Sequence, residues 1–210
     1  PFRTIPHAIL GTNDGDIILV APGTYGGPQE GAGIYPGGRA LTIKSLEGPF
    51  VTTLIGPGDG SGSVVVMDLH SSAHAVVLDG FTIADNVVTA EGCEHCAGGV
   101  FVGNQTNGTI INCIIRNNVG RNLTGGIEYN GEGGVIANNW IVGNYGGATP
   151  SSVGGVAVFP DAEVAIVNNT ISGNLGPSQD GVAGVLIHEG SSISRLDNNI
   201  VSFNTPGRGL

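Results

Sequence analysis

The segment Asn168-Asn-Thr-Ile171-Ser-Gly-Asn174 decides the fold, because its pattern recurs four more times along the chain. The central position is always Ile or Val, the last is always Asn, and the first is Asn in four of the five copies. Successive copies are 32, 26, 30 and 30 residues apart, which indicates stacked structural repeats. The other copies are Gly80-Phe-Thr-Ile83-Ala-Asp-Asn86, Asn112-Cys-Ile-Ile115-Arg-Asn-Asn118, Asn138-Asn-Trp-Ile141-Val-Gly-Asn144 and Asn198-Asn-Ile-Val201-Ser-Phe-Asn204.

A second set of segments runs in step with the first. Each member is a short alternating run after a glycine, which is typical of a strand. The members are Gly99-Val-Phe-Val, Gly126-Ile-Glu-Tyr, Gly155-Val-Ala-Val and Gly184-Val-Leu-Ile. One unit is therefore predicted to hold a strand, a turn, a second strand ending at Asn, and a third strand around the Ile. Such a unit is one coil of an all-β, single-stranded parallel β-helix, and the length predicts about seven coils.

The asparagine columns have a physical reason in such a solenoid. Equivalent side chains of consecutive coils lie about 4.8 Å apart, so they stack directly. An Asn side chain carries donors and an acceptor, and a column of Asn can form a hydrogen-bonded ladder along the rod. Asn also tolerates the left-handed backbone that sharp turns need.

The composition and charge of the chain agree with a solenoid and restrict the classes of binding partner to be expected. The 210 residues include 38 Gly, and 40% are hydrophobic but only 11% charged. The net charge of −10, with only 7 Lys and Arg, argues against binding to nucleic acid or to an anionic membrane. No apolar run reaches about 18 residues, so no membrane-spanning helix is expected.

The sequences at the two ends of the chain lead to different structural expectations. Thr4 to Leu10 is expected to form a short helix that begins near Pro6 and ends at Gly11, although an extended edge segment is the alternative. Residues 1–15 would then be an N-terminal cap and 16–210 the β-helix, most regular over 73–210. Gly209-Leu210 lies where another strand is expected to begin, so we expect either a longer chain or another copy to cover this end.

The segment Gly15-Asp-Ile-Ile-Leu-Val20-Ala-Pro-Gly-Thr-Tyr25, followed by the Asn-rich coils, resembles the right-handed parallel β-helix superfamily that includes pectate lyases. It resembles especially the secreted and cell-surface members without an assigned activity. The resemblance covers about residues 4 to 204. It is specific for the fold but not for the chemistry, because this fold hosts lyases, hydrolases, adhesins and fibres. For the enzymes it implies an outer sheet face with carboxylates that hold Ca²⁺ and an Arg or Lys base.

In the strands after the glycines, such a face would consist of the residues that point outward. The outward column reads Phe101, Glu128, Ala157, Leu186, without adjacent carboxylates and without Arg or Lys. The next outward column ends in Asn130, Phe159 and His188. With Asp161 these three residues are the candidate substrate-binding residues, and Phe159 would be a sugar platform. No catalytic residue is assigned and no cofactor is expected, although acidic loops around Asp85–Glu94 and Asp161–Glu163 could supply Ca²⁺ ligands.

Cysteines and sequons are the remaining chemical signals. Cys93-Glu-His-Cys96 is read as a disulfide that closes a loop or as free thiols, with a redox pair or half of a metal site as alternatives. Cys113 is expected to be buried. Asn104, Asn107 and Asn122 begin sequons and are candidate glycosylation sites in a secreted chain. Asn168 also begins a sequon, but we expect it to lie in the inner column and to be inaccessible.

The leading functional hypothesis is a secreted or cell-surface structural protein whose copies assemble end to end into a filament. A polysaccharide lyase or glycoside hydrolase is the alternative from another class. A carbohydrate-binding or adhesive fragment of a larger surface protein is the third possibility.

Overall fold

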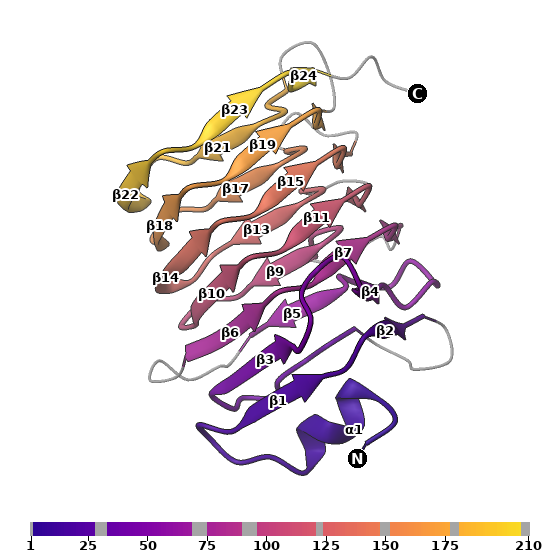
Figure 1. The fold of residues 1–210 in the computed structure, drawn as a ribbon. Helices are drawn as coiled ribbons and strands as arrows, with labels where there is room; N and C mark the ends of the chain where they lie inside the picture. Colours follow the sequence, from indigo (N-terminus) through magenta and orange to yellow (C-terminus); the bar gives the residue numbers. More distant parts are fainter. Residues whose placement is uncertain are drawn as a thin grey trace.

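The computed structural model describes residues 2–27, 33–68, 75–89, 96–120, 124–147, 152–176 and 181–206. These residues form a parallel β-solenoid with one short helix, α1 (Ile5–Leu10), at its N-terminal end (Figure 1). Every strand pairing is parallel, and successive coils stack from α1 to the last strands at the opposite end. The prediction of an all-β parallel solenoid is therefore confirmed.

Two long sheets run along the whole rod. Sheet A consists of β1 (Ile17–Val20), β3 (Leu41–Ser45), β6 (Ala75–Asp79), β10 (Asn107–Ile111), β14 (Glu132–Ala137), β18 (Glu163–Val167) and β22 (Ser192–Asp197). Sheet B consists of β2 (Gly23–Gly26), β4 (Thr52–Ile55), β7 (Thr82–Ala84), β11 (Ile114–Arg116), β15 (Trp140–Val142), β19 (Thr170–Ser172) and β23 (Ile200–Ser202).

Two shorter sheets complete the coils. Sheet C consists of β5 (Val65–Met67), β9 (Val100–Val102), β13 (Ile127–Tyr129), β17 (Val156–Val158) and β21 (Val185–Ile187). Sheet D consists of the two-residue strands β8 (Val87–Val88), β12 (Val119–Gly120), β16 (Tyr145–Gly146), β20 (Leu175–Gly176) and β24 (Thr205–Pro206). About five turns, from β6 to β24, are therefore regular. Within the described residues, sheets A and B each contain seven strands and sheets C and D each contain five, so the expected number of about seven coils is not reached by all four sheets.

The core is a stack of aliphatic side chains. The central residues of the repeated segments pair in register from coil to coil in sheet B and point inward. They alternate with outward residues because side chains of a strand point to opposite faces. Ile83, Ile115, Ile141 and Ile171 are all fully buried.

The last asparagine of each segment forms a ladder inside the corner that follows sheet B. The Asn118 Nδ2 donates to Asn144 Oδ1 at 3.1 Å, and the Asn174 Nδ2 donates to Asn204 Oδ1 at 2.9 Å. Each Nδ2 also donates to a backbone carbonyl, as Asn144 does to Ile115. The ladder thus satisfies polar groups that have no access to water.

The first asparagine of each segment has a different role. Asn112, Asn138, Asn168 and Asn198 have φ between 53° and 57°, so they make the sharp turn from sheet A to sheet B in the left-handed region. Their side chains are exposed, and the prediction that Asn168 is inaccessible is wrong. The inner residue at this corner is the next one, because the turn residue itself points outward. Asn139 and Asn169 donate to Asn169 and Asn199 there at 3.0 Å, which makes a second ladder.

The glycines that precede the strands of sheet C are required by close approach of adjacent coils. A Cβ on Gly99 would lie 2.6 Å from the carbonyl oxygen of Gly126, and a Cβ on Gly126 would overlap the carbonyl oxygen of Gly155. The Gly99 N–H also donates to the Gly125 carbonyl at 2.9 Å. The glycine column therefore marks where backbone packs against backbone.

The N-terminal helix forms as its sequence predicts. Thr4 is its N-cap, and its side chain accepts a hydrogen bond from the backbone N–H of His7. Ile5, Ala8 and Ile9 are buried in the same hydrophobic core as Ile18 and Val20 of β1. The apolar face of α1 therefore packs on the first coil.

Candidate functional site

The predicted outward column of sheet C exists in the expected register. Phe101 pairs with Glu128, Glu128 with Ala157, and Ala157 with Leu186. However, the first three of these residues are buried, and Glu128 is only 4% exposed. Strand alternation fixes which way a side chain points, but exposure depends on what packs over it. This column is therefore not an open binding face.

The candidate substrate-binding residues lie one step further, where the strands of sheet C end. The backbone N–H groups of Asn130, Phe159 and His188 donate to carbonyls of the preceding coil at 2.8, 3.0 and 2.9 Å. These bonds place the three half-buried residues on consecutive coils at one rim of the solenoid. The rings of Phe159 and His188 stack with centroids 4.6 Å apart and a tilt of 32°.

Polar groups accompany this ring pair. Asn130 Nδ2 lies 3.5 Å from Glu128 Oε1, so the buried carboxylate lies next to the rim. Within the described part of the chain, the buried Nε2 of His188 has no hydrogen-bond partner. The rim therefore combines an aromatic surface with an amide and an imidazole.

Asp161 lies at the same rim, in the turn two residues after Phe159. It is exposed and has a φ of 65°, and its backbone N–H donates to the Gly190 carbonyl of the next coil at 3.2 Å. Asn130, Phe159 and His188 thus come together as neighbours in one column, and Asp161 belongs to the adjoining turn.

A comparison with protein families identifies the fold family of the chain. The profile described as "Right handed beta helix region" matches residues 69–210, well over half of the sequence. The chain belongs to this family. No curated protein and no solved structure matches it. The resemblance stated from the sequence is therefore confirmed, and the match assigns no activity to the chain.

The cysteines of this right-handed β-helix have two different environments. Cys96 is disulfide-bonded, whereas Cys93 lies outside the described residues, so the pairing of these two remains a prediction. Cys113 is a free buried thiol, and burial raises its pKa to about 12. Its Sγ lies 3.1 Å from the Ile111 carbonyl and accepts from the Phe81 N–H at 3.5 Å. Cys113 thus occupies the place that Asn139 and Asn169 take in later coils.

Acidic side chains of the described residues pair with basic side chains in three places, one of which is Asp197 with Arg195 at 2.9 Å. Asp85, at the corner after sheet B, lies 3.3 Å from Arg116, and Asp79 lies 2.8 Å from Lys44. Among the described residues, no three His, Cys, Asp or Glu residues gather as metal ligands, while Glu91 and Glu94 lie outside them. A role for Ca²⁺ remains a prediction.

The sequons differ in accessibility. Asn104 lies in an exposed turn, Asn107 is the half-buried first residue of β10, and Asn122 lies outside the described residues. Glycosylation of these positions remains a prediction.

Within the described residues, the one helix, α1, has six residues and is too short to cross a bilayer.

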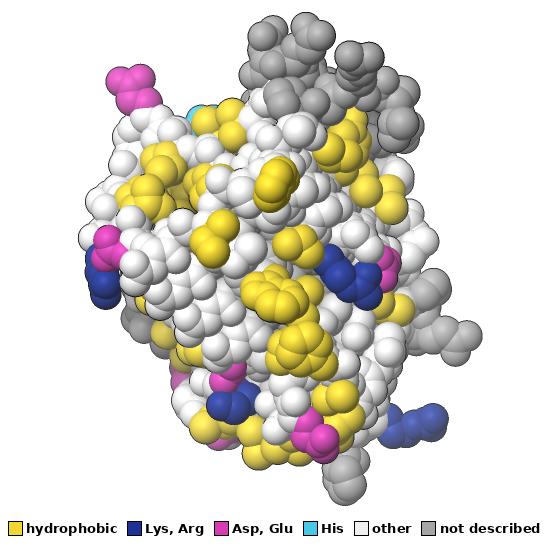
Figure 2. All heavy atoms as spheres, turned by 45° about the horizontal axis from the view of Figure 1, so that its top comes forward, with side chains coloured by type: hydrophobic (Ala, Val, Ile, Leu, Met, Phe, Trp, Pro, Cys, Tyr) yellow, Lys and Arg dark blue, Asp and Glu magenta, His cyan; other side chains and the backbone are white. Residues whose placement is uncertain are grey.

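An aromatic pair lies on the outer face of sheet B, and no pattern in the sequence predicts it. Phe50, in the turn before β4, and Trp140, in β15, are 79% and 54% exposed. Their rings meet edge to face with centroids 6.2 Å apart. Figure 2 shows large hydrophobic groups in the middle of this face, with Lys, Arg, Asp and Glu side chains toward its margins.

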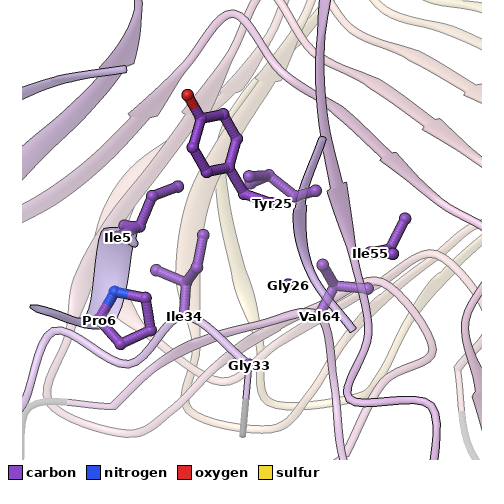
Figure 3. A pocket seen from close by; sticks show the side chains of 9 residues that line it. Ile5, Pro6, Tyr25, Gly26, Gly33, Ile34, Ile55 and Val64 are labelled. Carbon is purple, nitrogen blue, oxygen red and sulfur yellow. The ribbon is translucent and has the colours of Figure 1, made fainter. Parts of the chain in front are cut away.

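A hollow beneath α1 is too small to be a binding site. It lies between Ile5 and Pro6 of the helix and the side chains of Tyr25, Ile34 and Val64 (Figure 3). Its volume is about 10 Å³, about that of a single water molecule, and its lining is apolar. The hollow is a packing gap between the helix and the first coils.

Proposed function

We propose that this β-helix is a secreted or cell-surface structural protein whose copies contact one another end to end. In this proposal α1 is the N-terminal cap of a solenoid of about seven coils. The asparagine ladders and the glycine column give the rod a regular hydrogen-bonded frame. The observation that carries the proposal is the exposed core of the last described coil.

The inward residues of this coil are uncovered. Val201 is 53% exposed, whereas Ile171, its partner one coil below, is fully buried. Leu196 is 55% exposed above the buried Ile166, and Ile187 is 40% exposed above the buried Val158. An apolar surface with unpaired strand edges needs a cover of matching shape. Another solenoid end supplies that shape.

The opposite end also presents apolar side chains. Phe2 and Leu10, beside and on α1, are 63% and 73% exposed. A contact between these two unlike ends does not close on itself, so repeated contacts produce a filament. The occupant that we propose for the open coil is therefore the α1 end of a second copy.

The test is the molar mass of the chain in solution over a concentration series, together with electron microscopy. We expect the mass to rise above that of one chain as the concentration increases. Val201→Asp is expected to keep the mass at that of one chain, because the contact would remove the Asp charge from water at a cost in free energy. Val87→Asp is the matched control, because Val87 is 48% exposed on the side of the rod. A single-chain mass at every concentration would refute end-to-end contact.

A second candidate function is polysaccharide binding or cleavage at the rim of sheet C. The stacked rings of Phe159 and His188, next to Asn130 and Asp161, favour it, because the apolar faces of sugar rings pack on aromatic rings. Binding and chain cleavage are measured on uronic-acid polymers with and without Ca²⁺. We expect Phe159→Ala to weaken binding if the rim is the site. Unchanged binding by this variant would exclude the rim.

A further inference from the structure

Phe203 combines an unfavourable backbone conformation with an exposed side chain. Its φ is 55°, in the left-handed region that bulky residues rarely adopt, because the Cβ atom approaches the following carbonyl oxygen. The residue is 86% exposed, more than any other large hydrophobic residue in the described part of the chain. Neither property stabilises a single copy of the protein.

The four preceding coils use other residues at this turn. The equivalent positions after sheet B hold Asp85, Asn117, Gly143 and Gly173, with φ between 54° and 64°. Asp, Asn and Gly adopt this conformation at a lower cost than Phe does. The turn itself therefore does not require a phenylalanine, and strain that the fold does not require is characteristic of functional positions.

Phe203 lies at the open end of the rod, between β23 and β24 and two residues after the uncovered Val201. The last repeats are 30 residues apart, so at about 3.3 Å per residue the outline of a coil is about 100 Å long and encloses at most roughly 800 Å². One partner of a stable protein interface buries about the same area. The end face is therefore large enough to hold a second copy.

The opposite end of the rod has a groove with room for an aromatic ring. This groove lies between α1 and β1, has a volume of about 340 Å³ and is lined by Phe2, Ile17, Leu19 and Tyr25 among others, none of them charged. It runs along β1, the first strand of sheet A, which has a strand partner on one side only within the described residues. An apolar cavity of about 150 Å³ already accepts benzene. The groove therefore suits a phenyl ring and offers nothing to a charged ligand.

We propose that the Phe203 ring of one copy inserts into this groove of the next copy. The inference rests on the proposed end-to-end assembly and names the side chain that fixes how consecutive rods are rotated about their axis. Insertion removes the ring from water together with Ile17 and Leu19, which are 63% and 58% exposed in the single chain. The burial of these apolar groups offsets the unfavourable backbone conformation of Phe203.

Phe203→Asn separates association from folding, because Asn117 shows that asparagine fits this turn. We expect its free energy of unfolding, measured in urea at concentrations where the chains are single, to equal or exceed that of the parent. Its end-to-end association, measured by sedimentation equilibrium, is expected to weaken about tenfold or more. Leu19→Asn, in the groove, should weaken association likewise. Phe50→Asn is the matched control and should associate as the parent does, since Phe50 is equally large and 79% exposed on the side of the rod.

A mixture of the two weakened variants tests the pairing of ring and groove directly. Phe203→Asn keeps an intact groove and Leu19→Asn keeps an intact ring, so one copy of each can form a single complete contact. We expect two-chain particles in the mixture at concentrations where each variant alone is single. Longer particles are expected only for the parent and for Phe50→Asn.

The inference is overturned if Phe203→Asn associates as tightly as the parent, or if the mixture contains single chains only. In both cases the end-to-end assembly of the parent still stands. A loss of folding stability in Phe203→Asn would also overturn it, because the ring would then stabilise its own coil. If the parent itself is a single chain at every concentration, the proposed assembly and this inference fall together.

Discussion

The side-chain Nδ2 of Asn144 donates a hydrogen bond to the Oδ1 of Asn174, 30 residues later in the chain, at 3.0 Å. The backbone N–H of Asn144 donates to the same oxygen at 2.9 Å. Both residues are fully buried, so neither water nor another side chain replaces these bonds when one partner is removed. This pair therefore represents the interaction that repeats from coil to coil.

Asn144→Ala is expected to lower the free energy of unfolding by about 3–5 kcal/mol, because it removes several buried hydrogen bonds. Asn144 Oδ1 accepts from the N–H and the Nδ2 of Asn118, and Asn144 Nδ2 donates to the carbonyl of Ile115. Urea unfolding followed by circular dichroism measures the change. Asn104→Ala, in an exposed turn, is the control and should stay within about 0.5 kcal/mol of the parent. Equal losses for the two variants would show that the ladder does not stabilise the fold.

Gly126→Ala tests the close packing of sheet C. A methyl group there would meet the carbonyl oxygen of Gly155 on the next coil, so the two coils must separate. We expect a loss of about 1–3 kcal/mol, as for an overpacked core, and a lower thermal midpoint. Gly62→Ala is the control, since a Cβ at Gly62 meets nothing within 4 Å. A fully stable Gly126→Ala would contradict the backbone contact.

The buried thiol of Cys113 predicts a dependence of stability on alkaline pH. Burial raises its pKa from 9.0 to about 12 in the folded chain, so the unfolded chain releases the proton first. Stability is therefore full below pH 9 and falls as the pH rises from 9 toward 12, by at most about 1.4 kcal/mol per pH unit. Burial also raises the pKa of Tyr129, which adds a loss at higher pH.

Cys113→Ala separates the two contributions, because only the part that begins near pH 9 should disappear in this variant. Urea unfolding at intervals from pH 7 to 11 measures it. Identical pH profiles for the parent and Cys113→Ala would contradict the effect of thiol burial.

Much of the fold could be predicted from the sequence because the solenoid repeats its contacts at a fixed interval. The asparagines that end each segment revealed the register, and Ile115 and Ile141 revealed the inward face. The Asn139 to Asn199 ladder was missed, because Cys113 and Phe81 replace Asn in the first copies. Sheet D was missed as well, since strands of two residues, such as Val119–Gly120, have no measurable periodicity.

The candidate sites were predictable in register but not in exposure. The position of Phe159 beside His188 follows from the 29-residue spacing of equivalent positions in consecutive coils, whereas the burial of Glu128 depends on contacts between distant segments. Phe50 and Trp140 lie 90 residues apart, and Phe50 belongs to none of the repeated segments, so no local signal could pair them. Side-chain contacts across coils are therefore the part that needs the structure.

The most direct test of stacked coils is a double-mutant cycle between Asn144 and Asn174. The free energies of unfolding of the parent, Asn144→Ala, Asn174→Ala and the double variant are measured in urea under one set of conditions. We predict that the double variant loses less than the sum of the single losses, with a coupling of about 1 kcal/mol or more. Losses that add to within about 0.3 kcal/mol would mean that the two amides do not interact, and would contradict the ladder.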